Sequence, residues 1–302
     1  MRELYVGIDG GGTKSRMRLA DADLNLLAEA ALEKPSNLQL RDGDAAYEAI
    51  MALCEIIFAK AQIDPSGPVH ISACFGVAGG RLTAARDAFA VRKFPFAHLE
   101  VYDDIDIARA GAHNGKDGAV VIIGTGSAAL GLFDGVRHQC GGWGFHVGDD
   151  MAGAILGREL LRKSMTAHEG LTAQSALTKA VMTMFDNCPE KLMAWSFNNP
   201  ETGRPARPAD YGEFVPLVFE YFEKNDPVAA ELIAFELSST DKYVNWFKAR
   251  GARAIAIVGG LGQRMLPLLK DRYGDVIVAP KADPLQGAVI LAHQLFQKQH
   301  RS

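Results

Sequence analysis

A glycine-rich turn near the N-terminus separates two strand-like segments, and this arrangement limits the folds open to the chain. The segment reads GIDGGGTK over residues 7–14, after an apolar run and before a second strand-like run. A P-loop or a dinucleotide fingerprint would place its glycines between a strand and a helix. Three consecutive glycines exceed what a plain hairpin needs. The turn is therefore predicted to bind phosphate, with glycines that adopt positive φ and bring backbone N–H groups close to an anion.

A second turn of the same kind occurs in the middle of the chain. It reads IGTGS over residues 123–127 and again separates two strand-like runs, 119–123 and 128–133. Each turn opens a set of three short runs that follow one another closely, as the strands of an antiparallel meander do. No residue-level repeat of useful length accompanies this order. Two such turns nevertheless fit a pair of phosphate clamps, one in each of two lobes.

The order of strand-like and helical segments predicts a two-lobed α/β protein. Strands followed by helices, twice over, are typical of that class. Further strands are predicted at 69–76, 254–258 and 276–279, and helices at 44–61, 81–92, 261–270, 283–298 and through most of 149–250, with a polar interruption at 198–210. We place the N-terminal lobe at residues 1–113 and the C-terminal lobe at 114–285, with the last helix, 286–302, packing back on the N-terminal lobe.

Composition narrows the partners and the compartment. The 302 residues carry a formal net charge of −4, so the chain has no basic surface of the kind that binds nucleic acid. The four cysteines lie far apart and form no CxxC pair or zinc-like cluster, which indicates reduced thiols. The N-terminus does not resemble a signal peptide, and no apolar stretch is long enough to cross a membrane. We expect a cytoplasmic protein.

Three short motifs carry a resemblance to a known superfamily. The DGGGT turn at 9–13, the GTGS turn at 124–127 and VGGL at 258–261 resemble the phosphate-1, phosphate-2 and adenosine segments of actin, hexokinase and the heat-shock chaperones. Within that superfamily the chain is similar to the BadF/BadG/BcrA/BcrD-type ATPases, which include N-acetylglucosamine kinase and bacterial glucosamine kinase. The family-specific segment is CGGWGFHVGDD at 140–150, and bacterial glucosamine kinases share segments like DYGEF at 210–214 and DPLQGA at 283–288.

The resemblance implies a fold, an activity and its cofactors. It implies the two-lobed actin-like ATPase (ribonuclease H-like) fold, in which each lobe is a mixed five-stranded sheet with helices and ATP binds in the cleft. The implied reaction is ATP-dependent phosphorylation of the 6-hydroxyl of an amino sugar, N-acetylglucosamine or glucosamine, by a homodimer. Asp9 would hold Mg²⁺ through water. The residues implied in nucleotide binding are Asp9, Gly10, Gly11, Gly12, Thr13, Lys14, Gly124, Thr125, Gly126, Gly259 and Gly260.

A run of aspartates supplies the candidate catalytic base. Residues 101–106 read VYDDID, at the end of a predicted strand. In amino-sugar kinases the matching strand end supplies an aspartate that receives the proton of the sugar's 6-hydroxyl, and by position this is Asp104, with Asp103 as the rival. A carboxylate suits that role because it can align the hydroxyl and accept its proton. The alternative is that these aspartates cap the helix that starts there.

The sugar needs several convergent hydrogen bonds, because each hydroxyl buried without a partner costs about 1–3 kcal/mol. Trp143 offers a face on which a sugar ring stacks, although a tryptophan is more often a core residue. Two departures from N-acetylglucosamine kinase, at Ala128 and Phe145, leave the preference for an acetyl group open, whereas a third, at Asp150, is mild. The residues that the resemblance places around the sugar are Asn37, Asp104, Ser127, Gly142, Trp143, Gly144 and Asp149.

Other functions remain as alternatives. Related ATPases carry an iron–sulfur cluster and activate radical dehydratases or reductases; Cys140 alone fits that pattern, but no second suitable cysteine follows it. The zinc-containing repressor and kinase group has a tight Cys/His cluster that this sequence lacks. A protein that binds without turnover is expected to lack the base. The sequence therefore favours a hexosamine kinase.

Overall fold

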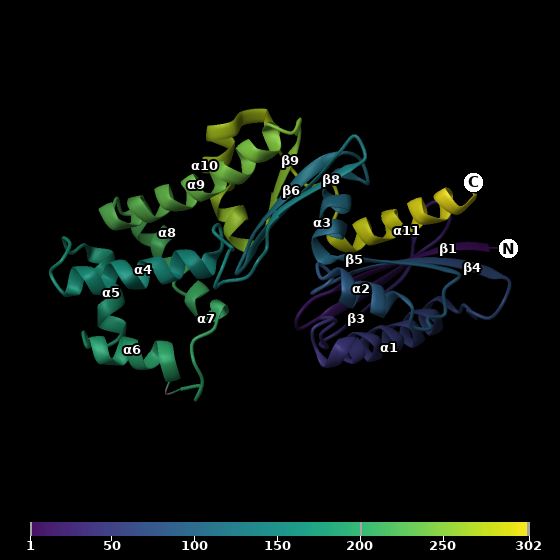
Figure 1. Cartoon of the computed structure of the whole chain (residues 1–302), viewed down its shortest axis with the longest axis horizontal. Helices are drawn as coiled ribbons and strands as arrows, with labels where there is room; N and C mark the ends of the chain where they lie inside the picture. The colour runs from purple at the N-terminus through teal and green to yellow at the C-terminus, as the bar shows by residue number, and fades with distance from the viewer. Residues whose placement is uncertain (1, 200, 301–302) are drawn as a thin grey trace. The chain divides into compact units, whose positions relative to one another are not determined.

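The computed structural model describes residues 2–199 and 201–300 and divides into two compact units (Figure 1). Unit 1 comprises Met1–Val120, Leu130–Arg137 and Ala279–Ser302, and unit 2 comprises Val121–Ala129 and His138–Val278. In the part of the chain that the structure describes, no helix combines the length and the apolar character needed to cross a bilayer.

The first sheet is mixed and has five strands in the order β3-β2-β1-β4-β5. Strands β1 to β3 form an antiparallel meander, whereas β4 and β5 run parallel to β1. The carboxyl ends of β1, β4 and β5 therefore lie at one edge. The strands are β1 (Arg2–Gly10), β2 (Ser15–Ala20), β3 (Leu26–Leu32), β4 (Val69–Val77) and β5 (His98–Asp103).

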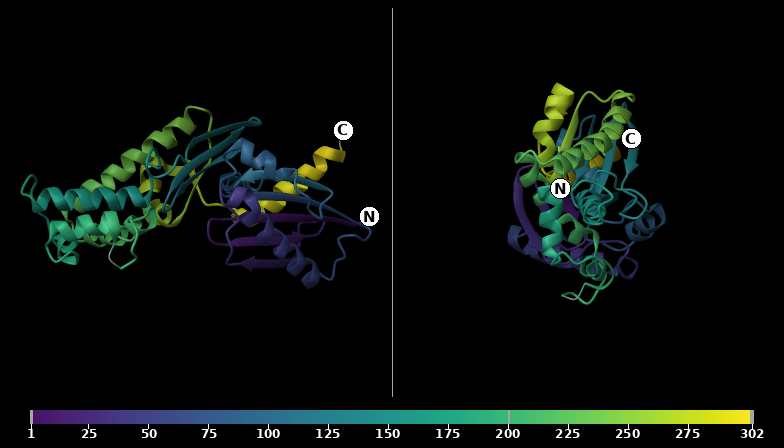
Figure 2. Two further views of the ribbon diagram at one scale, coloured as in Figure 1. Left: turned by 60° about the horizontal axis from the view of Figure 1, so that its bottom comes forward. Right: turned by 90° about the vertical axis from the view of Figure 1, so that its left-hand side faces the viewer.

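Helices cover both faces of this sheet, as the two views of Figure 2 also show. Helix α1 (Asp44–Ala61) buries Ile50, Leu53 and Ile57 against one face, together with residues of α2 (Thr83–Ala90). Helices α3 (Asp104–His113) and α11 (Pro284–His300) pack on the other face. Glycine makes this packing close: a Cβ at Gly287 would lie 2.0 Å from the carbonyl oxygen of Ile107 in α3.

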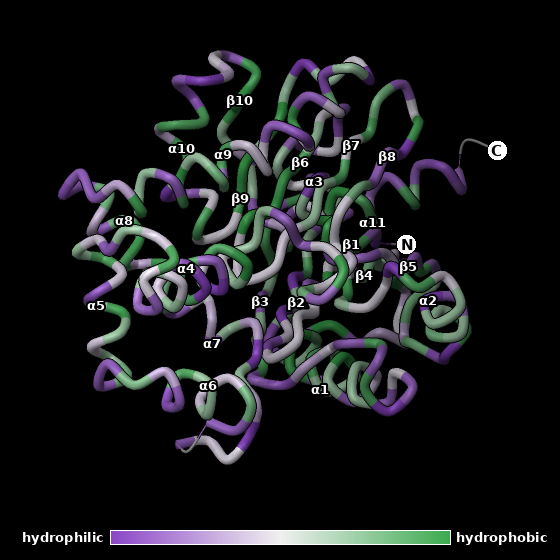
Figure 3. Tube along the Cα trace, turned by 60° about the vertical axis from the view of Figure 1, so that its left-hand side comes forward, coloured by the Kyte–Doolittle hydropathy of each residue, from purple (hydrophilic) through white to green (hydrophobic). Residues whose placement is uncertain are grey.

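The second sheet has five strands in the order β10-β9-β6-β7-β8. Strands β6 and β9 are the hydrophobic centre of this sheet and are green in Figure 3, which fits strands buried on both faces. The strands are β6 (Gly118–Ile123), β7 (Ser127–Phe133), β8 (Val136–Gly141), β9 (Ile255–Val258) and β10 (Ile277–Val278). The helices of unit 2 are α4 (Gly153–His168), α5 (Ala176–Met184), α6 (Pro189–Asn198), α7 (Pro208–Gly212), α8 (Val215–Glu223), α9 (Pro227–Lys248) and α10 (Gly260–Tyr273).

The expected fold class is confirmed, because two five-stranded sheets with flanking helices succeed one another along the chain. Two local differences affect the site. Asp104 is the first residue of α3 rather than the end of a strand, and the polar interruption at 198–210 runs into the short helix α7. The lobe boundary at residue 113 stays a prediction.

Candidate active site

The first glycine-rich turn joins β1 to β2 in unit 1. The N–H of Gly11 donates to the carbonyl oxygen of Lys14 at 2.9 Å, which closes a tight hairpin turn, and Gly12, Thr13 and Lys14 are exposed at its tip. The ammonium of Lys14 lies 3.2 Å from the carboxylate of Glu33 in a solvent-exposed ion pair. The turn therefore presents N–H and side-chain donors to solvent, as a phosphate site requires.

The expectation that these glycines adopt positive φ was wrong. None of Gly10, Gly11 and Gly12 lies in the positive-φ region. Position 10 requires glycine for a steric reason instead, because a Cβ at Gly10 would lie 2.6 Å from the Cβ of Ser36 in the neighbouring loop. A Cβ at Gly12 would meet no atom within 4 Å. Close approach of a second chain segment thus explains the first glycine, whereas open space surrounds the third.

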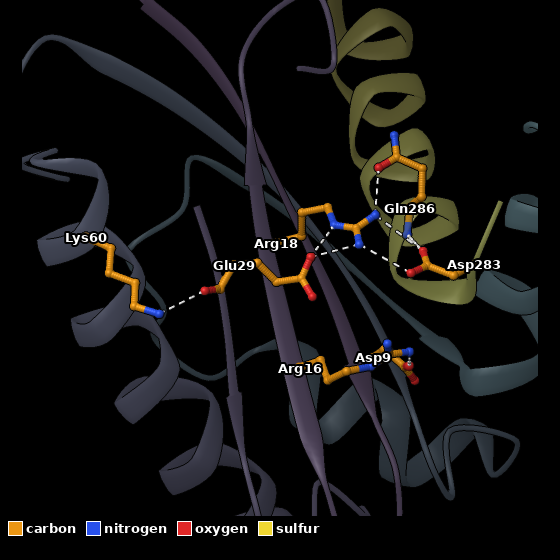
Figure 4. Close-up of polar contacts among 7 residues, drawn as sticks. All are labelled: Asp9, Arg16, Arg18, Glu29, Lys60, Asp283 and Gln286. Carbon is orange, nitrogen blue, oxygen red and sulfur yellow. Dashed lines mark hydrogen bonds and ion pairs between the residues drawn. The ribbon is translucent and has the colours of Figure 1, made fainter. Parts of the chain in front are cut away.

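Asp9 lies on β1, directly opposite Arg16 of β2 in the strand register. The guanidinium of Arg16 donates to the Asp9 carboxylate (Figure 4), and the Asp9 side chain remains 21% exposed. On the same strand, Arg18 bonds to Glu29 at 2.9 Å and to Gln286 at 3.0 Å, which ties β2 to the start of α11. Asp9 is thus a partly exposed carboxylate on a rigid strand, balanced by one positive charge.

Parallel pairing brings the sequence-distant candidates of unit 1 to one edge. Gly10 pairs with Val77, and Val77 pairs with Asp103, so the ends of β1, β4 and β5 are level. The loop that holds Asn37 joins the same edge through a parallel bridge to Ala78. Asp9, Asn37 and the aspartate run therefore share the carboxyl edge of this sheet, where ligands bind in open α/β sheets.

The three aspartates at 103, 104 and 106 have different surroundings. Asp103 is 7% exposed and is the N-cap residue of α3, but its side chain makes no capping hydrogen bond. Asp106 is 6% exposed and accepts two hydrogen bonds from Arg137, at 2.8 and 2.9 Å. Asp104 alone of the three is exposed. A sugar hydroxyl can therefore reach Asp104 more readily than its neighbours.

The electrostatics of the edge favour a proton acceptor at Asp104. Its surface is open to solvent, yet protein atoms crowd its surroundings, and this burial raises the pKa of Asp104 to about 7. The negative charges of Asp103, Asp9 and Asp106 act in the same direction. Because the Asp104 side chain is exposed even though protein atoms surround it, we attribute its raised pKa chiefly to the cluster of neighbouring carboxylates. A base with a pKa near the working pH suits proton transfer.

Asn37 is a turn residue in this structure. Its side-chain oxygen accepts a hydrogen bond from the backbone N–H of Gln39 at 2.8 Å, as in an Asx turn. Gly79, with φ of 79°, packs beside it, and a Cβ at Gly79 would lie 2.8 Å from that same oxygen. The Asn37 oxygen is thus held by the loop. A part in sugar binding would fall to the amide nitrogen.

The second glycine-rich turn belongs to unit 2 and joins β6 to β7. The first amides of α4 donate to its carbonyls, from Gly153 to Gly124 at 2.8 Å and from Ala154 to Thr125 at 3.3 Å. The adenosine-like segment is adjacent: Gly259 has φ of 93°, and a Cβ there would lie 2.5 Å from the carbonyl oxygen of Ile123. The turn and this segment are therefore packed together.

A cavity of about 340 Å³ opens beside these two segments, within unit 2. Gly124, Thr125 and Gly260 line it, as expected for residues that bind one nucleotide. Sequence reasoning assigned no role to its other lining residues, which are Gly153, Ala209, Gly212, Glu213, Val215, Pro216, Leu261 and Arg264. Two of them, Gly212 and Glu213, belong to the DYGEF segment at 210–214, which was the sequence signal that could have identified them.

Two contacts hold that segment against the cavity. Arg204 donates to Asp210 at 2.6 and 3.1 Å, and this pair holds the pKa of Asp210 at about 2. A Cβ at Gly157 of α4 would lie 1.9 Å from the carbonyl oxygen of Tyr211, so only glycine allows α7 to pack so closely. The position of Glu213 at the cavity therefore depends on Asp210 and Gly157.

The segment 141–149 is a loop shaped by left-handed residues. Gly141, Gly142 and Gly144 have φ of 67°, 70° and 86°, and Asp149 has φ of 59°. The Asp149 carboxylate accepts the N–H of Gly144 at 3.1 Å, and burial raises its pKa. The buried Ser127 hydroxyl accepts the N–H of Met151 at 3.3 Å. Asp149 and Ser127 thus both brace this loop.

Trp143 and Phe145 occupy different environments in the same loop. Trp143 is 61% exposed, so the alternative that it is a core residue was wrong. Phe145 stacks on Tyr211 with ring centroids 5.3 Å apart, and the guanidinium of Arg158 lies 5.1 Å from its ring. Phe145 therefore anchors the loop to α7, while Trp143 presents its indole to solvent.

Comparisons with known proteins agree with this architecture. The model of the BadF/BadG/BcrA/BcrD ATPase family matches residues 6–292. Glucosamine kinase GspK of Vibrio cholerae is 29% identical over 97% of this chain and 98% of its own length. N-acetyl-D-glucosamine kinase of Dictyostelium discoideum is 27% identical over 76% of this chain and 74% of its own. The crystal structure of a protein from Chromobacterium violaceum, described there as a putative N-acetylglucosamine kinase, has a TM-score of 0.79 and 30% identity, covering 96% of this chain and 99% of that one.

Proposed function

Because this chain belongs to the BadF/BadG/BcrA/BcrD ATPase family, we propose that it is an ATP-dependent hexosamine kinase. The reaction is transfer of the γ-phosphoryl group of ATP to the 6-hydroxyl of glucosamine or N-acetylglucosamine. Relatives that match nearly the whole chain bear the names of such kinases. The structural observation that supports it best is Asp104, an exposed carboxylate with a raised pKa at the carboxyl edge of the first sheet.

The nucleotide roles are distributed over both glycine-rich turns. In unit 1, the exposed tip of the turn offers Gly12, Thr13 and Lys14 to phosphate oxygens. In unit 2, the cavity beside Gly124, Thr125 and Gly260 receives the nucleoside. Gly10, Gly11, Gly126 and Gly259 act through the backbone shape of these turns. Glu213 and Arg264 are added as cavity residues.

Mg²⁺ is the expected partner of ATP, and Asp9 fits it. The ion prefers oxygen ligands and is usually held by one or two carboxylates, waters and the substrate phosphates. Asp9 supplies one such carboxylate, on β1 beside the first glycine-rich turn. The ion supplies neutralisation of the phosphate charge. Arg16 keeps the Asp9 carboxylate oriented.

Asp104 carries the proton transfer in this mechanism. It accepts a hydrogen bond from the 6-hydroxyl, aligns that oxygen with the γ-phosphorus and takes the proton late in the step. The bond from O6 to phosphorus forms as the bond from phosphorus to the β,γ-bridging oxygen breaks, and ADP leaves. Asp103 and Asp106 stay buried and keep the local field negative, which makes Asp104 the stronger base.

Candidate sugar-binding residues occur in each unit taken by itself. In unit 1, the Asn37 amide and Asp104 face the carboxyl edge of the sheet. In unit 2, Ser127, Trp143 and Asp149 contribute side chains, and Gly142 and Gly144 contribute the left-handed backbone that presents them. Because Ala128 offers no side-chain hydrogen-bond partner, we expect a free 2-amino group to be accepted at least as well as an acetamide.

A coupled assay of ADP release over a panel of hexoses and hexosamines tests this function. We expect turnover with glucosamine and N-acetylglucosamine and little ATP hydrolysis without sugar. Asp9→Asn should lower Mg²⁺-dependent turnover by orders of magnitude, because the carboxylate no longer holds the metal-bound water. The exposed Asp23→Asn is the matched control and should retain activity. Equal ATPase rates with and without every sugar would favour the iron–sulfur activator class instead.

We also propose that the kinase is a cytoplasmic homodimer without a nucleic-acid partner. The net charge of −4 argues against binding to a polyanion, and none of the four cysteines forms a disulfide within the described residues. Light scattering after size-exclusion chromatography would test the dimer. A monomeric mass at micromolar concentration would contradict it.

A further inference from the structure

A second cavity of about 370 Å³ lies in unit 2, on the loop that carries Trp143. It shares no lining residue with the nucleotide cavity. Its size falls within the range of small-molecule sites, about 300–1,000 Å³. The residues that line it are Cys140, Gly141, Trp143, Val147, Gly148, Asp150, Lys242, Tyr243 and Trp246. The cavity therefore joins the candidate sugar loop to one face of α9.

Glycines hold the loop and α9 together at this place. Gly141 has φ of 67°, and a Cβ there would lie 2.9 Å from the ring of Tyr243. A Cβ at Gly148 would lie 3.0 Å from that of Trp143, and the N–H of Gly148 donates to Gly144 at 2.9 Å. Close backbone packing thus sets the approach of the loop to the Tyr243 ring and of Gly148 to Trp143.

The cavity combines aromatic walls with polar groups. The ring of Trp246 is covered on one side by the guanidinium of Arg250, 3.7 Å from its centroid, and lies near the ring of His138. Trp143 and Val147 are 61% and 81% exposed, so this wall of the cavity presents large apolar side chains at the surface. Asp150, Lys242 and the Tyr243 hydroxyl add acceptors and donors.

This mixture matches a sugar ring better than a purely apolar group. A pyranose has apolar C–H faces that pack on aromatic rings and an edge of hydroxyls that needs hydrogen bonds. The Tyr243 hydroxyl is protonated at neutral pH like that of any tyrosine, and burial, with Asp150 acting in the same direction, raises its pKa further, to about 12. An apolar acyl group would form no hydrogen bonds with Asp150 and Lys242.

We propose that this cavity is a subsite for a second sugar ring, so that the enzyme also phosphorylates the terminal hexosamine of an amino-sugar disaccharide. The inference rests on the proposed kinase function and on Trp143, which belongs both to the candidate sugar loop and to the cavity. The phosphoryl step is unchanged: O6 of the terminal sugar bonds to the γ-phosphorus of ATP, ADP leaves, and Asp104 receives the proton.

Steady-state kinetics with glucosamine and with its β-1,4-linked disaccharide test the subsite. We expect the KM of the disaccharide to be about tenfold lower than that of glucosamine, a typical gain for one stacked ring. Trp246→Ala should abolish this advantage and change glucosamine turnover less than about twofold. Tyr243→Phe, which removes only a hydroxyl, should raise the disaccharide KM alone. Phe197→Ala, an exposed aromatic on α6 outside the cavity, is the matched control and should change neither sugar.

The outcomes separate this inference from the function on which it rests. Phosphorylation of glucosamine but not of the disaccharide overturns the subsite and leaves the kinase in place. An equal loss of turnover with glucosamine and with the disaccharide in Trp246→Ala would also overturn the subsite, because Trp246 would then support the folded protein rather than bind the second ring. A gain seen only with N-benzoylglucosamine would assign the cavity to the N-substituent and overturn the proposal. Failure with every amino sugar removes the kinase function itself.

Discussion

The acidic edge of unit 1 and the glycine-rich loop of unit 2 are built on opposite principles. At the edge, the backbone is regular, since Gly10, Gly11 and Gly12 avoid positive φ, and the chemistry lies in carboxylate side chains at strand ends. In the loop 141–149, four residues adopt left-handed conformations, and Trp143 and Val147 are exposed whereas Asp149 is buried. We therefore expect substitutions at the edge to change turnover, and substitutions in the loop to change stability and sugar affinity.

The largest expected effect tests the edge. Asp104→Asn keeps the size of the side chain but removes the proton acceptor, so kcat should fall about 10²–10⁴-fold with ATP affinity nearly intact. Steady-state kinetics and a nucleotide-binding titration measure both quantities. Asp103→Asn, at a buried position, should instead lower stability. Loss of kcat in Asp103→Asn alone would move the base by one residue.

A carboxylate in unit 2 shows that a raised pKa alone does not make a base. Glu236 of α9 is fully buried, neither of its oxygens has a hydrogen-bond partner in the described structure, and burial raises its pKa to about 8. Below about pH 4.5 both folded and unfolded states hold the proton. As pH rises toward 8 the unfolded chain releases it first, so stability falls, and above pH 8 the loss is constant.

Glu236→Gln should therefore stabilise the protein relative to wild type by roughly 5 kcal/mol at pH 8.5 and far less at pH 5. Urea denaturation at both pH values measures the difference, and turnover at neutral pH should be retained. Glu223→Gln, at an exposed position, is the matched control and should show no such dependence. A pH-independent gain in Glu236→Gln would contradict the assigned cause.

The pH profile of turnover sharpens the assignment of the edge. Because burial and the neighbouring carboxylates raise the pKa of Asp104 to about 7, the base is protonated below that pH. We expect kcat/KM to rise about tenfold per pH unit up to about pH 7 and then to level off. Asp104→Asn should lose this acidic limb. A flat profile from pH 5.5 to 8 in wild type would show that another group accepts the proton.

The smallest expected effect compares the two glycine segments directly. A Cβ at Gly12 or at Gly144 would meet no atom within 4 Å, but only Gly144 has positive φ, at 86°. Gly144→Ala should therefore cost about 1–2 kcal/mol, while Gly12→Ala should change stability by less than about 0.5 kcal/mol. Thermal unfolding of both variants measures this. Equal costs would mean that backbone conformation does not distinguish the segments.

Much of the fold was accessible from the sequence because its signals are local. The helix predicted at 44–61 coincides with α1, and the strands at 119–123 and 128–133 coincide with β6 and β7 to within one residue. Apolar periodicity and glycine punctuation depend only on near neighbours in the chain. The sequence left the start of α3 at Asp104 as the alternative to a strand end, since a strand end and a helix N-cap favour the same residue types, and the structure shows the helix.

The amino-acid sequence by itself determined the order of the elements, the two glycine-rich turns and the family. Only the tertiary structure distinguished among Asp103, Asp104 and Asp106, because burial and the ion pair with Arg137 come from residues distant in the chain. It also decided that Gly10 is needed for contact with Ser36 rather than for its dihedral angles, and that Trp143 is exposed. Strand register and packing set these properties, and both depend on which segments meet in the folded chain.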